Sequence, residues 1–194
     1  DELFRHHTPE EMPEEAARSA VEALGAEVPQ GGMATVILHP SVVGLLAHEA
    51  IGHTVEADFV LAGSIVKDRI GQKVAAETIT LVDDHLPEPD PASSGVLLVD
   101  DEGTIPRKAV IIKDGILAGY LHDTETAAVF GVPPTGNARA FTYRDEPIIR
   151  MRNTYILPGN CSVEEMIART PDGIYCKGLG LSGQADANAE FMFD

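Results

Sequence analysis

The segment His48-Glu49-Ala50-Ile51-Gly52-His53 places two imidazoles and one carboxylate within six residues. Neutral imidazole is a preferred ligand of zinc in proteins. A carboxylate held beside the metal can accept a proton from a coordinated water, which makes that water a nucleophile near neutral pH. The segment therefore predicts a metal centre in which His48 and His53 are ligands and Glu49 is the general base.

The spacing of the two histidines requires a distortion of the helix. They are five residues apart, one more than in the common helical zinc motif HExxH. On a regular helix this separation turns the second side chain by roughly 140°, so the two rings would not face one ion. Either a π-type turn restores a shared side, or the helix ends at Gly52 and a bent segment directs His53. We predict one of these two distortions.

A less specific interpretation places the three motif side chains on a solvated or capping helix end, where ordinary hydrogen bonds satisfy them. The apolar run from Val42 to Ala47 argues against it, because it predicts a mostly buried helix, and ionisable groups are rarely buried without a partner or a metal. Two acids, Glu56 and Asp58, follow the motif. Each either accepts a hydrogen bond from an imidazole, as carboxylates do at zinc sites, or is a solvated surface acid.

Composition narrows the class of protein. The 194 residues are 44% hydrophobic and contain no Trp, so the core must consist mainly of aliphatic side chains. There are 14 Lys and Arg against 31 Asp and Glu, a net charge of −17, which argues against nucleic acid and anionic membranes as partners. Two cysteines form no disulfide framework, and without a signal peptide or a long apolar run we expect a cytoplasmic protein. The chain begins at Asp1 and ends on a strand-like alternation, so we expect a piece of a longer protein.

Hydrophobic periodicity and turn residues predict an α+β fold with a mainly antiparallel sheet, carrying the metal-motif helix and further short helices. Asp114-Gly115 is a strong two-residue hairpin signal. The predicted helices cover residues 9–24, 41–57, 124–130 and 163–169, and the predicted strands cover 34–38, 78–82, 96–99, 109–113, 116–121, 148–156 and 173–177. A glycine-rich bend follows at 178–183.

Several motifs together resemble one known family. Besides Leu46–His53, they are Pro134–Asn137, Asn153–Gly159, Gly173–Tyr175, and Gly183–Asp186 with Phe191–Phe193. Their order from about Val36 onward is similar to that of the TldD/PmbA family of metallopeptidases, on the TldD side. The resemblance implies that residues 1–194 are a single domain, most of the catalytic C-terminal region, without the family's N-terminal domain and extreme C-terminus.

The same resemblance implies an activity, a cofactor and a partner. The family's zinc-dependent peptidases cut unfolded or extended peptides, with His48 and His53 as zinc ligands and Glu49 as the base. Their third ligand is a Cys that would lie beyond residue 194, and neither Cys161 nor Cys176 occupies its place. The homologous TldE/PmbA subunit lacks the metal signature and pairs with TldD as a heterodimer, so we expect such a partner or a homodimer.

Substrate residues are predicted on the strand 148–156 and the bend 178–183, where an extended peptide could pair with a strand edge. We name Asn153, Gly180 and Gly183 as candidates. Two rival functions stay open. One is a catalytically silent binding or regulatory subunit of the same family, which would bind no stoichiometric zinc. The other is a purely structural β-rich module, in which the two imidazoles would not converge.

Overall fold

The computed structural model describes residues 8–27, 30–87, 93, 95–177, 183–185 and 191–193, the last two ranges as backbone alone. Its contacts divide the chain into two units, Asp1–Ala34 and Thr35–Asp194. The described part of the first unit contains the helix α1 (Glu11–Leu24). Two reciprocal bonds fix its start: the Thr8 N–H donates to Glu11 Oε2 at 2.8 Å, and the Glu11 N–H donates to Thr8 Oγ1 at 3.2 Å.

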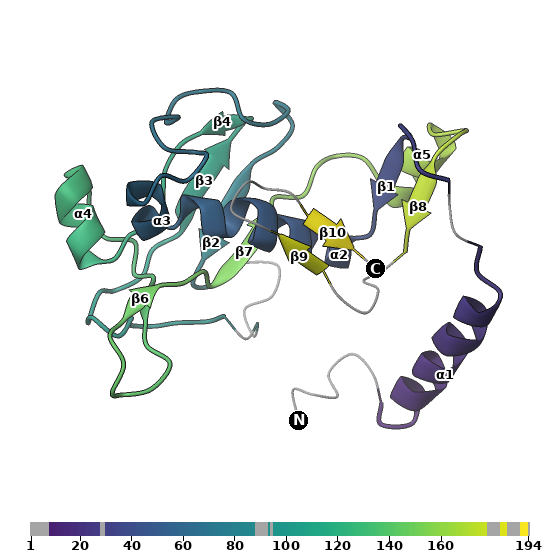
Figure 1. The fold of residues 1–194 in the computed structure, drawn as a ribbon, viewed down its shortest axis with the longest axis horizontal. Helices are drawn as coiled ribbons and strands as arrows, with labels where there is room; N and C mark the ends of the chain where they lie inside the picture. The colour runs from purple at the N-terminus through teal and green to yellow at the C-terminus, as the bar shows by residue number, and fades with distance from the viewer. Residues whose placement is uncertain are drawn as a thin grey trace. The chain divides into compact units, whose positions relative to one another are not determined.

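The second unit is built on a four-stranded antiparallel sheet with the strand order β4-β3-β2-β7 (Figure 1). Its strands are β2 (Leu81–Asp84), β3 (Ala109–Lys113), β4 (Ile116–Leu117) and β7 (Asn153–Ile156). The predicted hairpin joins β3 to β4. Asp114 and Gly115 have φ values of 48° and 80°, the positive values that a two-residue type I′ turn requires.

Three pairs of short strands complete the described sheets. β5 (Ala138–Arg139) pairs with β6 (Ile148–Ile149), and β9 (Gly183–Ala185) pairs with β10 (Phe191–Phe193), both antiparallel. β1 (Val36–Leu38) and β8 (Ile174–Cys176) form a parallel pair. The unit is therefore α+β with mainly antiparallel pairing, as the sequence predicts.

Four strand predictions are wrong in part or entirely. The strand predicted at 78–82 begins only at Leu81 and extends to Asp84, and the strand predicted at 116–121 ends at Leu117. The predicted strand 148–156 is broken into β6 and β7, because the backbone between them bonds elsewhere: the Arg150 N–H donates to Asn137 O, and the Arg152 N–H donates to Asp83 Oδ1. The predicted strand 96–99 does not form, and its residues Leu98 and Val99 are exposed. The Leu97 N–H donates to His85 O, but the segment forms no ladder with a described strand, so its β-propensity alone does not make it one.

The helices of the second unit are short. The motif lies in a continuous helical run composed of α2 (Pro40–Leu46), a π-helical turn η2 (Ala47–Gly52) and a 3₁₀ turn η3 (His53–Val55). α3 (Ala57–Leu61), α4 (Thr124–Phe130) and α5 (Val163–Ala168) follow. α5 begins with a capping box between Ser162 and Glu165. No helix in the described ranges is both long and apolar enough to cross a membrane.

The core of the second unit joins the motif segment to the sheet. Buried apolar side chains from η2, η3 and α3 form one cluster with those of the strands and of the segment between β6 and β7. Its members include Ala47, Val55, Val60, Leu81, Ile111, Ile112, Leu117, Leu121, Ile149 and Met151. Full burial of such an aliphatic side chain contributes about 1.5–3 kcal/mol. This packing holds the motif segment against the sheet.

Candidate metal centre

The helix carrying the motif changes its winding where the histidines require it. α2 is a regular helix as far as Leu46, and the next six residues form the π-helical turn η2. The wider winding brings His48 and His53 together, with their ring centroids 4.9 Å apart and the ring planes at 83°. Of the two predicted distortions, the π turn is the one that forms. The helical run continues past Gly52 into η3 rather than ending there.

Gly52 allows the π turn to lie close to the chain leading into β7. A Cβ at position 52 would overlap Met151 Sδ and come within 2.9 Å of Met151 Cε. It would also lie 3.3 Å from the carbonyl oxygen of Ala47. Met151 is only 3% exposed, so its side chain has little room to move away. The absent side chain at Gly52 is therefore part of the packing that holds the turn.

The three motif side chains converge. His48, Glu49 and His53 each offer one ligand atom, and these atoms lie within 4.8 Å of one another. Two nitrogens bound to one tetrahedral zinc ion are about 3.3 Å apart, from Zn–N distances near 2.0–2.1 Å. Small side-chain rotations would bring the imidazoles to that spacing. This donor set fits a zinc ion, and it argues against the structural module in which the rings would point apart.

The two nitrogens of His53 face different carboxylates. Nε2 lies 3.9 Å from Glu49 Oε2, on the side of the motif cluster. Nδ1 lies 3.3 Å from Glu56 Oε2, a side chain that is completely buried. Of the two acids that follow the motif, Glu56 is therefore the one that contacts an imidazole. Asp58 is exposed and accepts a bond from the N–H of Phe59, as expected for a surface acid.

The surroundings shift the pKa values of the two imidazoles in opposite directions. Burial lowers the pKa of His48, and the nearby His53 lowers it further. The hydrogen bond to Glu56 raises the pKa of His53, although burial opposes the change. A metal binds the neutral ring. His48 is thus neutral over a wider range of pH than a free histidine, whereas His53 competes more strongly for a proton in the metal-free protein.

Comparison with known proteins identifies the family of this chain. The family model described as the PmbA/TldA metallopeptidase C-terminal domain matches residues 31–194. The chain belongs to this metallopeptidase family. It is 43% identical over 173 residues to a metalloprotease of Methanocaldococcus jannaschii (89% of this chain, 37% of the relative), and 40% identical over 173 residues to a zinc metalloprotease TldD homolog of Saccharolobus solfataricus (89% and 38%).

The fold of this chain is also found in a solved structure. The crystal structure of TldE from Thermococcus kodakarensis superposes with a TM-score of 0.71 at 26% identity, over 83% of this chain and 36% of that one. The chain spans about two fifths of the length of the curated relatives that it matches.

A buried polar network beside the motif was not predicted from the sequence. Arg152 Nε lies 2.8 Å from Asp83 Oδ2, and both side chains are almost completely buried. Asp83 also accepts bonds from Thr154 Oγ1 and Asn137 Nδ2, so one carboxylate ties β2 to β7 and to the turn before β5. The available signal was Arg152, a charged residue inside the predicted strand 148–156, whereas Asp83 lay just outside the predicted strand 78–82. Their partners lie 54–71 residues away in sequence, which no local pattern reveals.

The three predicted substrate residues fall in different places. β7 and β9 both lie beside η2, so Asn153 and Gly183 belong to strands next to the motif. The Asn153 side chain is already engaged: its Nδ2 donates to Asp84 O, and its Oδ1 accepts a bond from Ser93 Oγ. Gly180 lies outside the described residues.

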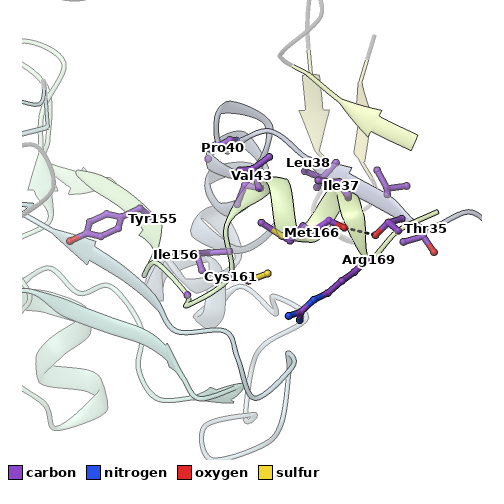
Figure 2. A pocket seen from close by; sticks show the side chains of 15 residues that line it. Thr35, Ile37, Leu38, Pro40, Val43, Tyr155, Ile156, Cys161, Met166 and Arg169 are labelled. Atoms are coloured by element: carbon purple, nitrogen blue, oxygen red, sulfur yellow. Dashed lines mark hydrogen bonds between the residues drawn. The ribbon is translucent and has the colours of Figure 1, made fainter. Parts of the chain in front are cut away.

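An apolar groove adjoins the motif helix, with a cavity volume of about 770 Å³ (Figure 2). Pro40, Val43 and Gly44 line it from α2, and Gly44 is one helical turn before His48. Its other walls come from β1, from the end of β7 and from the segment around α5, as Figure 2 shows.

The two cysteines lie apart from the motif side chains. Cys161 lies in the wall of the groove and is exposed, whereas Cys176 is half-buried in β8. Neither cysteine belongs to the described metal-ligand cluster.

Proposed function

We propose that this chain carries the catalytic centre of a zinc-dependent metallopeptidase that hydrolyses unfolded or extended peptides. The observation that carries the proposal is the convergence of His48, Glu49 and His53 within 4.8 Å at a π turn. Family membership and the naming of a relative as a zinc metalloprotease support it.

Each motif side chain has a separate role in the proposed reaction. His48 and His53 hold the zinc ion, which when bound polarises the scissile carbonyl and acidifies water. Glu49 accepts the proton of the attacking water and returns it to the leaving amine nitrogen. Its carboxylate lies 3.9 Å from His53 Nε2 and is half-buried, so it lies beside the metal-binding face of that ring and remains open to solvent.

The exposure of the site favours extended substrates. His48 is exposed, and Glu49 and His53 are half-buried. An extended peptide can bring a backbone carbonyl to such a surface site, whereas the backbone of a folded protein is mostly held in its own hydrogen bonds. A TldE-like subunit is the proposed partner, since TldE shares this fold.

The test compares Glu49→Gln with His48→Gln in the complete protein. We expect Glu49→Gln to retain zinc, measured by elemental analysis, and to lose hydrolysis of an unstructured fluorogenic peptide. His48→Gln should lose both. Cleavage at the wild-type rate by Glu49→Gln would refute the role of Glu49 as the base. A wild-type protein with no stoichiometric zinc would instead favour the catalytically silent subunit.

A further inference from the structure

Glu56 is a buried carboxylate placed directly after the metal motif. It follows the 3₁₀ turn in extended conformation, and its backbone forms a parallel bridge with Leu121. The Leu121 N–H donates to Val55 O at 2.9 Å, and the Ala57 N–H donates to Leu121 O at 3.0 Å. These bonds on both sides fix the backbone of Glu56, so its side chain is aimed by the fold rather than by a flexible loop.

The contacts of this carboxylate are unusual for a buried acid. Oε2 lies 3.3 Å from His53 Nδ1 and 4.0 Å from Arg150 Nη1, whereas Oε1 has no hydrogen-bond partner in the described part of the chain. Burying an incompletely paired carboxylate costs free energy of folding. A well-packed apolar side chain of similar volume avoids that cost. The geometry therefore favours a role for Glu56 beyond packing.

The role follows from the hydrogen-bonding capacity of a carboxylate. A carboxylate accepts and does not donate, so its bond to His53 requires the proton to be on Nδ1. In a neutral ring the lone pair is then on Nε2, the nitrogen that faces Glu49 and the motif cluster. Imidazoles that bind metals generally donate their other N–H to such an acceptor.

We propose that Glu56 is a positioning residue, which locks the His53 ring in the Nδ1–H tautomer with Nε2 directed into the metal centre. Arg150 supports the arrangement as the cation beside the same oxygen. The inference rests on the proposed function, because the free lone pair on Nε2 is proposed to bind the metal. The tautomer itself is a property of the metal-free chain and is measured separately.

The first measurement is the tautomer of His53 in the metal-free protein, from long-range ¹H–¹⁵N correlation spectra recorded where the ring is neutral. We expect the Nδ1–H form in the wild type and its loss in Glu56→Leu, which has no acceptor. Glu56→Gln retains a neutral carbonyl acceptor and should preserve the tautomer in part. It also keeps the inference testable if the leucine variant does not fold. The matched control is Asp84→Asn, a neutralised buried carboxylate whose charged neighbours are Lys108 and His85 rather than a motif histidine.

The second measurement is Zn²⁺ affinity, by competition with a chromophoric chelator. Loss of such a supporting partner typically weakens metal binding about 10–100-fold, which we expect for Glu56→Leu, with a smaller loss for Glu56→Gln and none for Asp84→Asn. A wild-type His53 in the Nε2–H form would overturn the inference, as would wild-type tautomer and affinity in both Glu56 variants. Absence of Zn²⁺ binding by the wild type would overturn the proposed function instead, and the tautomer would still decide the role of Glu56.

Discussion

Gly52→Ala tests whether packing against the sheet holds the π turn. The added Cβ would overlap Met151 Sδ, and Met151 is 3% exposed within the core cluster. The Ala47 carbonyl oxygen, 3.3 Å from the new Cβ, restricts retreat toward the helix. One added carbon must therefore displace either a core side chain or the turn that carries both histidines.

The expected loss of stability is the difference between two opposing effects. Overpacking a well-filled core costs about 1–3 kcal/mol. Alanine is about 0.8–1.0 kcal/mol more favourable than glycine in a helix. Because Met151 is 3% exposed and the Ala47 carbonyl oxygen lies 3.3 Å from the new Cβ, we place the packing cost in the upper half of its range. The net result is a loss of about 1–2 kcal/mol in the free energy of unfolding.

Urea denaturation followed by circular dichroism measures this loss. Repeating the substitution in a protein that lacks the Met151 side chain tests whether the overlap causes it. A Met151→Ala protein is itself about 2–5 kcal/mol less stable, but it lacks the overlap. In that protein Gly52→Ala should leave the free energy of unfolding unchanged or raise it by up to about 1 kcal/mol. The matched control is Gly44→Ala, because nothing lies within 4 Å of a Cβ there. It should stabilise the wild type. An equal cost of Gly52→Ala in both backgrounds would refute the packing explanation.

Two further predictions concern the buried ionisable groups. Arg152→Met leaves the Asp83 carboxylate buried without its cation and should cost about 3–5 kcal/mol in urea unfolding, whereas a loss below about 1 kcal/mol would show that the pair is dispensable. Burial lowers the pKa of His122. The unfolded chain therefore binds more protons, and the stability contributed by the neutral ring is lost as the pH falls through about 6.5 toward the lower folded-state pKa. The free energy of unfolding should thus decrease more steeply between pH 7 and 5 in the wild type than in His122→Gln, and equal slopes would contradict this assignment.

Features with a local cause could be predicted from the sequence. The i, i+5 spacing of His48 and His53 required a distorted helix, and the π turn forms there. The turn at Asp114-Gly115 depends on only two residues and was predicted correctly. The break within 148–156 was missed, because it follows from bonds of Arg150 and Arg152 to partners distant in sequence.

The geometry of the site depends on more than its six-residue signature. A π turn has poorer intrinsic stability than a regular helix, so contacts outside it must favour it. The Met151 side chain occupies the space left by Gly52 on one side, and the bridge between Glu56 and Leu121 fixes the chain where it leaves the motif. A sequence carrying the same six residues without these supports would have the winding of a regular helix available, which separates the two imidazoles. The convergence of the motif side chains is therefore a property of the packed unit, and substitutions at these supporting positions should alter the affinity of the proposed metal site without removing any of its proposed ligands.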